Sequence, residues 1–270
     1  GKHTISDHGA PAGVIRNLTP ANILEVSSNV GMIHIAQRLT PEEHRDALLR
    51  FGFGRDTDSG IKGEGRGKLP KLPWKEITQA SLSYGYSLSV TPLQILTAAS
   101  ALANDGAYHS PRIIQRILSP KGEVLQEFPP APAKQAVSPE TARKMLHMMQ
   151  AVVDEGTGAS AGIPGYNVAG KTGTANKAKE TGGGYSRDVM SSFIGFVPAE
   201  KPRIVVLALL DSPQSAHYAS QTASPLFKAV AADTLRVLGV VPKPEGGEPL
   251  AGKPHPDAHA EATHATRRYR

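Results

Sequence analysis

Three strand patterns followed by one amphipathic helix constrain the fold of the second half of the 270-residue sequence. The strands are predicted within YNVAGKTGTAN (166–176), VMSSFIGFVP (189–198) and RIVVLALLD (203–211). The last segment is apolar enough to predict a central position in a sheet. Residues 224–239, SPLFKAVAADTLRVLG, carry apolar side chains at helical spacing, so we expect a helix that covers one face of that sheet.

The first half is predicted to be mainly helical. In LTPANILEVSSNVGMIHIAQRL (18–39) the helical apolar spacing is interrupted by Ser27-Ser28-Asn29, which predicts two short helices that meet at this polar run. Residues 52–73 are predicted to form a long loop, and two short strands flank the turn at 119–122. Three further helices begin with a hydroxyl cap and a proline in the first turn: Thr40-Pro41, Thr91-Pro92 and Ser138-Pro139.

Composition argues against one class of partner and predicts a disordered segment at the carboxyl end. The net charge of +6 comes from scattered basic residues without interleaved aromatics, so no nucleic-acid partner is predicted. No apolar run approaches the roughly 18 residues of a membrane span. Residues 241–270 are rich in Pro, Gly, Ala and His, which predicts a disordered tail. For His255, His259 and His264 a solvated tail is favoured over weak metal binding, and we predict no metal or cofactor.

The segment GYNVAGKT matches the phosphate-binding loop pattern G-x-x-x-x-G-K-[ST], with Gly165, Gly170, Lys171 and Thr172 in the specified places. Such a loop requires a hydrophobic strand before the first glycine and a helix that starts at the lysine. The preceding DEGTGASAGIP is no strand, and the glycines that follow Lys171 argue against a helix. We therefore interpret Lys171 as part of an edge strand that faces a cleft.

The same lysine has a second interpretation. Lys171-Thr172-Gly173-Thr174 resembles the K-T-G signature of penicillin-binding proteins and serine β-lactamases, which lies on a strand beside the active site. These proteins also have a Ser-x-Asn element at a break between helices, and Ser27-Ser28-Asn29 is such an element. In order along the chain, SSNVGM, RFGFG, YGYSLSVTPLQ and GYNVAGKTGTANK resemble the transpeptidase domain of class B penicillin-binding proteins of the septal, penicillin-binding protein 3 type.

The resemblance implies an α+β fold like that of penicillin-binding proteins and serine β-lactamases. Its parts are an antiparallel sheet flanked by helices and a helical subdomain, here incomplete at the amino terminus. We assign residues 1–240 to a partial transpeptidase domain, with a mainly helical part at 1–155 and the sheet and last helix at 156–240. Residues 241–270 form the predicted tail.

The resemblance also implies a role for each motif residue. Lys171 and Ser27 would pass a proton to the departing D-Ala nitrogen, and Asn29 would hold an amide of the donor stem peptide. Thr172 and Thr174 would bind the terminal carboxylate, which penicillin imitates, and the Thr174 N–H would be an oxyanion donor. Gly173 would let the substrate backbone lie beside the strand. His217 and Tyr218 occupy a loop where the family often has aromatics.

The implied function is cross-linking of D-Ala-D-Ala stem peptides by D,D-transpeptidation during cell division. The implied partners are peptidoglycan stem peptides, β-lactams and septal division proteins. The parent protein is expected to be anchored in the inner membrane with this domain in the periplasm. A binding role without catalysis is the alternative; a D,D-carboxypeptidase or β-lactamase shares the motif chemistry but fits YGYSLSVTPLQ less well.

The family's nucleophile and base form a Ser-x-x-Lys motif, expected a few dozen residues before Ser-x-Asn. The one Ser-x-x-Lys of this sequence, Ser59 to Lys62, follows Ser-x-Asn and lies in a glycine-rich stretch, so we reject it as the nucleophile. The chain as given is therefore expected to lack its nucleophile, to be inactive alone, to expose apolar surface and to be marginally stable.

Overall fold

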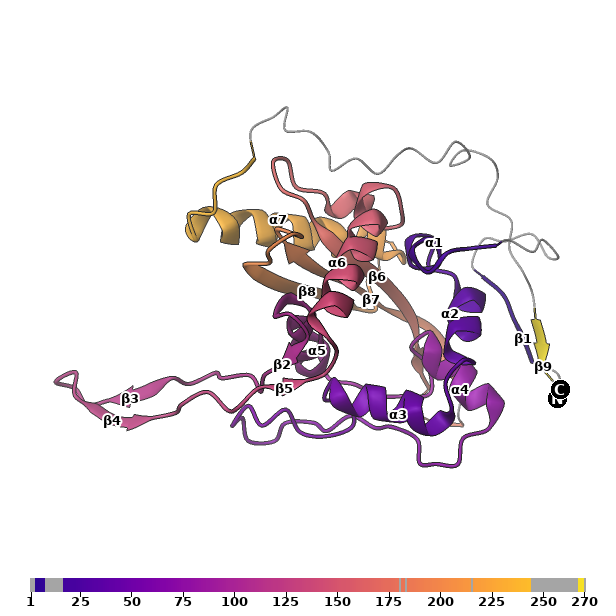
Figure 1. Ribbon diagram of the computed structural model, residues 1–270, viewed down its shortest axis with the longest axis horizontal. Coiled ribbons are helices and arrows are strands. Elements are labelled where there is room, and N and C mark those ends of the chain that lie inside the picture. Colours follow the sequence, from indigo (N-terminus) through magenta and orange to yellow (C-terminus); the bar gives the residue numbers. More distant parts are fainter. Residues whose placement is uncertain are drawn as a thin grey trace.

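The computed structural model describes residues 3–7, 17–179, 181–182, 184–214, 216–243 and 267–269. Within these residues, six helices precede the main sheet along the chain and one follows it. Figure 1 shows how they are arranged around the sheet. The helices are α1 (Pro20–Glu25), α2 (Asn29–Ala36), α3 (Pro41–Arg50), α4 (Glu76–Ser83), α5 (Pro92–Ala103), α6 (Pro139–Asp154) and α7 (Ala223–Val237), with short 3-10 turns η1 (Ala159–Ala161) and η2 (Ala219–Gln221).

The main sheet is antiparallel and contains β6 (Ala169–Ala178), β7 (Tyr185–Val197) and β8 (Ile204–Asp211), in that order. Its register places Lys171 opposite Ile194, and Val197 opposite Ile204. The three strands and the covering helix are confirmed. The expected central position of β8 is wrong within the described residues, because β7 lies between the other two strands. The apolar run in β8 reflects helices packed on both faces of the sheet and not the number of neighbouring strands.

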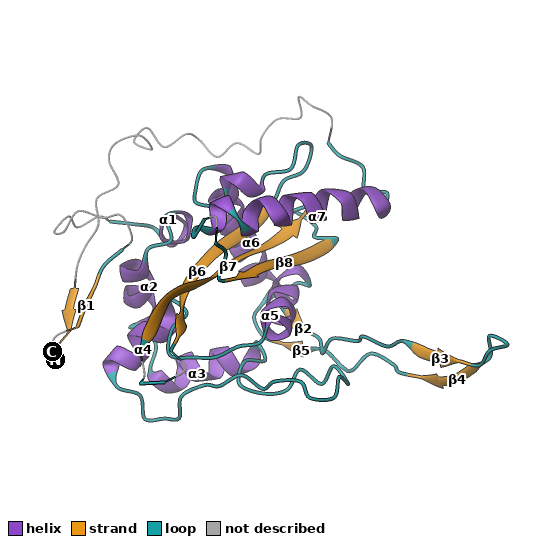
Figure 2. Ribbon diagram, turned by 180° about the vertical axis from the view of Figure 1, so that it is seen from behind, coloured by secondary structure: helices purple, strands orange, loops and turns teal. Residues whose placement is uncertain are grey.

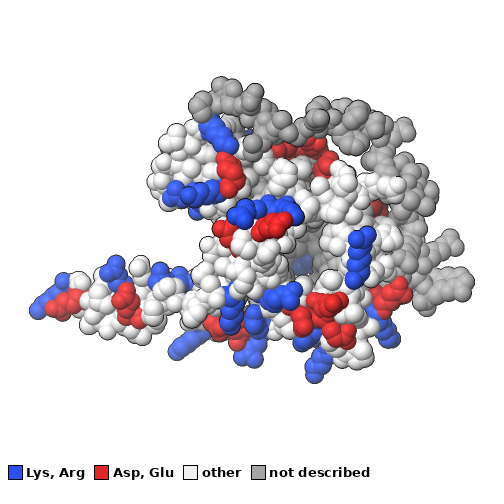
Figure 3. All heavy atoms as spheres, in the orientation of Figure 1, with Lys and Arg blue, Asp and Glu red and all other residues white. Residues whose placement is uncertain are grey.

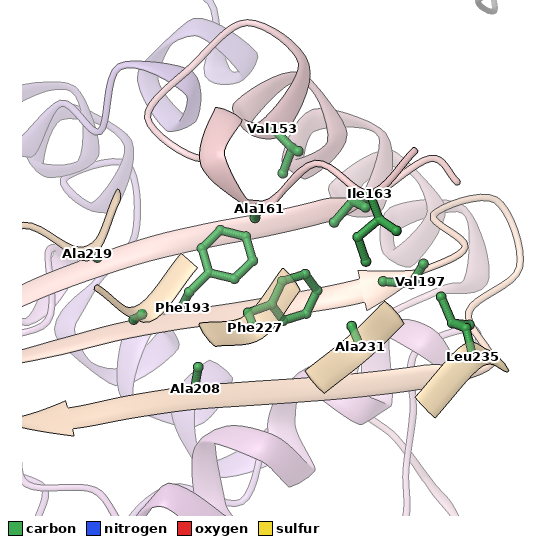
Figure 4. Packing of buried hydrophobic residues seen from close by; sticks show 12 residues of the cluster. Val153, Ala161, Ile163, Phe193, Val197, Ala208, Ala219, Phe227, Ala231 and Leu235 are labelled. Carbon is green, nitrogen blue, oxygen red and sulfur yellow. The ribbon is translucent and has the colours of Figure 1, made fainter. Parts of the chain in front are cut away.

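The sheet lies between two helical layers. Successive side chains of a strand point to opposite faces, so Phe193 packs toward α7 and Phe196 toward α5 and α6. Figure 4 shows the first of these cores, where Phe193 and Phe227 meet with ring centroids 4.7 Å apart. A Cβ on Gly170 would lie 2.3 Å from Phe193 Cζ, so the close packing of this ring requires glycine at 170.

The helix predictions in the first half are confirmed, and side-chain caps explain the starts of all its helices except α4. Thr40 and Thr91 each form a capping box, in which the hydroxyl accepts from the third residue of the helix and that residue's side chain accepts from the threonine N–H. Helices α1 and α2 meet at the polar run. Ser27 there has a φ of 56°, in the left-handed region that side-chain-bearing residues seldom adopt.

A hairpin of β3 (Arg116–Leu118) and β4 (Val124–Glu127) extends away from the body, as Figures 1 and 2 show. The pair β2 (Ala107–Tyr108) and β5 (Lys134–Gln135) closes the base of this arm. Figure 3 shows basic and acidic side chains mixed over the body and along the hairpin. Large apolar side chains of the arm are exposed: Ile113, Ile114, Ile117, Leu118, Val124 and Leu125.

Near the two ends of the chain, β1 (His3–Ile5) pairs with β9 (Arg267–Tyr269) in antiparallel fashion. Most of the tail predicted at 241–270, including its three histidines, lies outside the described residues; β9 is a strand that the tail prediction did not include. No helix in the described part of the chain is both long and apolar enough to span a membrane. The predicted division of the domain into a helical part at 1–155 and a sheet part at 156–240 stays a proposal.

Candidate active site

The structure brings Ser27 and Lys171 together although 144 residues separate them along the chain. Lys171 lies on β6, and its Nζ donates to Ser27 Oγ at 2.8 Å and to the Thr172 main-chain oxygen at 3.1 Å. Ser27 is exposed at the break between α1 and α2. Because Ser27 Oγ accepts from the lysine, its own hydroxyl hydrogen can be donated to a third group.

Burial changes the proton affinity of Lys171. Removal from water disfavours the charged ammonium form, and this desolvation lowers the pKa of Lys171 to about 8. The hydroxyl of Ser27 and the carbonyl of Thr172 are its neutral hydrogen-bond partners. A lysine with this pKa exchanges its proton far more readily near neutral pH than an ordinary lysine does.

Asn29 is the first residue of α2 and is half-buried. Its Nδ2 donates to the Ser6 main-chain oxygen at a long 3.5 Å. The side chain of Ser28 caps the same helix by accepting from the Gly31 N–H. The helix start therefore sets the position of Asn29 relative to Ser27.

Thr172 and Thr157 form a pair of hydroxyls beside Lys171. The two Oγ1 atoms are 3.0 Å apart, and Lys171 Nζ lies 3.5 Å from Thr172 Oγ1. Thr157 follows α6, and its N–H donates to the carbonyl of Glu25, the last residue of α1. Thr157 thus links the end of α1, two residues before Ser27, to strand β6.

Thr174 lies further along β6 and is exposed. Its Oγ1 accepts from the Ala219 N–H at 3.4 Å, which brings η2 and the loop before it close to the strand. His217 and Tyr218 belong to this loop and are both exposed. The loop is therefore adjacent to the K-T-G strand.

Gly173 has a close contact on its own sheet. A Cβ at this position would come within 2.6 Å of Ser192 Oγ on β7. Ser192 Oγ also donates to the Gly173 carbonyl at 3.4 Å. Glycine at 173 thus leaves space for the Ser192 hydroxyl, a reason for this residue that the sequence did not suggest.

Among the described strands, β6 forms one edge of the main sheet, as predicted for Lys171. The Asn176 N–H on this edge donates to Tyr86 Oη at 3.1 Å, and the Thr172 carbonyl there accepts from Lys171. Alternation along a strand then directs the N–H and C=O of Thr174 to the same edge. Tyr86 contacts Tyr185 edge-on, with centroids 4.8 Å apart, so aromatic rings stand beside this end of β6.

Neither competing interpretation of the motifs fits this geometry. The phosphate-loop interpretation requires a helix that begins at Lys171, but Lys171 lies in strand β6, which runs to Ala178. Its Nζ contacts Ser27. Ser59 lies in a loop and donates to Glu64 Oε2 at 2.7 Å. A serine that faces a carboxylate in a loop lacks the lysine one helical turn away that a Ser-x-x-Lys nucleophile needs.

Sequence reasoning missed three residues of this region. Asp7 contacts the start of α2, Thr157 contacts Thr172, and Tyr86 contacts the end of β6. Tyr86 falls inside the quoted motif YGYSLSVTPLQ, which was a usable signal. Asp7 and Thr157 carry no local signal, because their partners lie elsewhere in the sequence.

Comparison with known proteins supports the family resemblance. PbpB of Mycolicibacterium smegmatis is 38% identical over 243 residues, which cover 86% of this chain and 37% of PbpB. The peptidoglycan D,D-transpeptidase FtsI of Escherichia coli is 33% identical over 228 residues, which cover 83% of this chain and 37% of FtsI. The chain therefore spans little more than a third of the length of these relatives.

Solved structures of penicillin-binding protein 3 share the fold. The Mycobacterium tuberculosis protein in complex with ampicillin has a TM-score of 0.77 at 36% identity, covering 86% of this chain and 54% of that one. The apo transpeptidase domain from Burkholderia pseudomallei has a TM-score of 0.73 at 36% identity, covering 83% of this chain and 66% of that one. These matches confirm the predicted fold and type. Residues 1–232 match the family model of the penicillin-binding protein transpeptidase domain, and the chain belongs to that family.

Proposed function

We propose that the protein of which this sequence is part is a peptidoglycan D,D-transpeptidase that cross-links D-Ala-D-Ala stem peptides, and that residues 1–240 supply one side of its active site. A serine nucleophile gives its hydroxyl proton to the lysine of its Ser-x-x-Lys motif and attacks the carbonyl of the penultimate D-Ala. The bond to the terminal D-Ala nitrogen breaks, and that nitrogen takes up a proton as it leaves. An acceptor amine then takes over the acyl group.

In this proposal Lys171 and Ser27 deliver the proton. Lys171 donates to Ser27 Oγ while the Ser27 hydroxyl donates to the departing nitrogen, so one proton moves along the pair and one reaches the leaving group. The contact of 2.8 Å and the lowered pKa of Lys171 are the observations that carry this assignment. An ordinary lysine would hold its proton too tightly at neutral pH to act in this way.

The remaining motif residues bind substrate. Asn29 has both a donor and an acceptor for a peptide amide of the stem. The hydroxyls of Thr172 and Thr174 donate hydrogen bonds to the terminal carboxylate, and Lys171 contributes positive charge nearby. The Thr174 N–H at the β6 edge is an oxyanion donor, and the edge itself pairs with an extended peptide as an added strand would.

We extend the proposal to the setting of the whole protein. Its substrates are peptidoglycan stem peptides and its inhibitors are β-lactams, as expected for relatives named D,D-transpeptidases and for a structural relative that binds ampicillin. The Ser27-Ser28-Asn29 form supports the septal type. Because cross-linking takes place outside the cytoplasm, we place the domain in the periplasm of a protein anchored in the inner membrane, beside division partners.

The test is the intact mass of the full-length protein after incubation with benzylpenicillin, followed by peptide mapping of the adduct. We expect one adduct per molecule on a serine of a Ser-x-x-Lys motif. The variant Lys171→Ala should form the adduct about 100-fold more slowly, because it loses the proton relay. Lys177→Ala is the matched control on the same strand; its ammonium contacts Asp211 at 2.6 Å, and its rate should be unchanged.

Other outcomes would change the assignment. An adduct on Ser59 or Ser27 would mean that the nucleophile is misplaced. No adduct, with retained binding of a stem-peptide analogue, would favour the alternative of a binding role without catalysis.

A further inference from the structure

The buried carboxylate of Asp7, which belongs to neither helix, accepts hydrogen bonds at the break between α1 and α2. Asp7 is 7% exposed and follows β1. Its Oδ2 accepts from the Ser28 hydroxyl at 2.7 Å, and its Oδ1 accepts from the Val30 N–H at 2.9 Å. Both carboxylate oxygens are therefore engaged by the two residues that enclose Asn29.

Ser28 transmits this contact along the helix start. Its side chain is 2% exposed, and its Oγ donates to Asp7 while it accepts from the Gly31 N–H at 2.9 Å. The rotation of the Ser28 side chain is thus determined at both ends. A negative charge is also favourable here, because the amino terminus of a helix carries partial positive charge.

The backbone that this network restrains is unusual. Ser27 adopts a φ of 56°, a conformation that persists only when its surroundings enforce it. Ser28 follows Ser27 directly and is the residue that Asp7 binds. On the other side, the Thr157 N–H holds the Glu25 carbonyl at 3.3 Å. The exposed Ser27 hydroxyl, 2.8 Å from Lys171 Nζ, lies between these two restraints.

We propose that Asp7 is a positioning residue for the reaction: through the Ser28 hydroxyl and the Val30 N–H it holds Ser27 and Asn29 in register with Lys171. The inference rests on the proposed function. The contacts of Asp7 described above are with Ser28 and Val30 at the start of α2, and not with the threonines of β6. Loss of Asp7 should therefore slow the chemical step and leave the initial binding of a β-lactam carboxylate in place.

The test measures acylation of the full-length protein by a chromogenic β-lactam, with the initial dissociation constant and the acylation rate constant determined separately. Asp7→Asn keeps the size of the side chain but replaces one acceptor oxygen by an NH₂ donor, so the side chain can no longer accept from both the Ser28 hydroxyl and the Val30 N–H. We expect the acylation rate constant to fall about 10- to 100-fold, as small misplacements of reacting groups do. The initial dissociation constant should remain as in the parent.

Two further variants make the test specific. Ser28→Ala removes the hydroxyl but keeps the Asp7 contact to Val30, and it carries the test if Asp7→Asn does not fold. When Asp7→Asn and Ser28→Ala are combined, the acylation rate constant should fall by less than the product of the two single effects, because both changes break the same contact. Asp46→Asn, at an exposed carboxylate on α3, is the matched control and should retain the parent rate.

The results separate the two proposals. A parent that acylates normally together with an Asp7→Asn variant that acylates equally fast would overturn the positioning role alone. Fully multiplicative losses would overturn the route through Ser28. A parent that is never acylated would overturn the proposed function, and this inference with it.

Discussion

The lowered pKa of Lys171 makes a prediction about stability that does not depend on substrate. The ordinary lysine value is 10.5, and desolvation brings that of Lys171 to about 8. Each pH unit of such a difference corresponds to about 1.4 kcal/mol between the two protonation states, so keeping this ammonium buried costs about 3 kcal/mol at pH 7. The substitution Lys171→Met removes the titrating group and retains much of the side-chain volume.

The sign follows from proton binding. Between about pH 8 and 10.5 the folded protein has released the Lys171 proton while the unfolded chain still holds it. The unfolded state then binds more protons, so the free energy of unfolding rises with pH across this window. Between pH 7 and pH 11, we expect the free energy of unfolding of the unsubstituted protein to rise by about 3 kcal/mol more than that of Lys171→Met. Groups that titrate equally in both proteins cancel in this difference.

The assay is urea denaturation followed by circular dichroism at constant ionic strength, from pH 7 to 11 in half-unit steps. Lys171→Arg is the matched control, because its guanidinium stays charged throughout this range and its stability should lack the same rise. If the difference between parent and Lys171→Met were independent of pH, the Lys171 pKa would not be lowered and its role as a proton donor would lose its basis.

Three further predictions concern the surroundings of Lys171. Thr157→Val should weaken the initial binding of a β-lactam carboxylate up to about 10-fold while Thr157→Ser retains it, because one hydroxyl beside Thr172 is lost; equal affinities in an acylation assay would contradict this. Gly170→Ala should lower the free energy of unfolding by about 1 to 3 kcal/mol, since its Cβ would overlap the Phe193 ring; an unchanged urea midpoint would refute the packing argument. ATP with Mg²⁺ should leave the melting temperature unchanged, and stabilisation that saturates with ATP would revive the phosphate-loop interpretation.

Local signals in the sequence predicted most helices and the three strands of the main sheet, but not the short strands β1, β2, β5 and β9. The capping box of Thr40 and Glu43 joins residues three apart, so the start of α3 depends on neighbours that the sequence displays side by side. The break at Ser27 to Asn29 was also predicted, because the helical spacing of apolar residues is interrupted there. The strand at Lys171 was predicted because the glycines that follow it disfavour a helix. Family resemblance, and not spacing, supplied their roles.

The strand order was not determined by such signals. The apolar run of β8 predicted burial on both faces, which the structure has, but it carried no information about which strand would be its neighbour. Strand order depends on hydrogen bonds to other segments, and these leave little trace in the composition of the strand itself.

The sequence by itself predicted most helices and the three strands of the main sheet, and it singled out Ser27, Asn29 and Lys171 as motif residues. Only the tertiary structure decided that Ser27 accepts a hydrogen bond from Lys171, that Thr157 meets Thr172 and that Asp7 binds Ser28. These contacts join residues that no local pattern pairs, because threonine and aspartate have many roles at the surface and at turns. The lowered pKa of Lys171 has the same origin, since desolvation is a property of the packed site and not of the lysine.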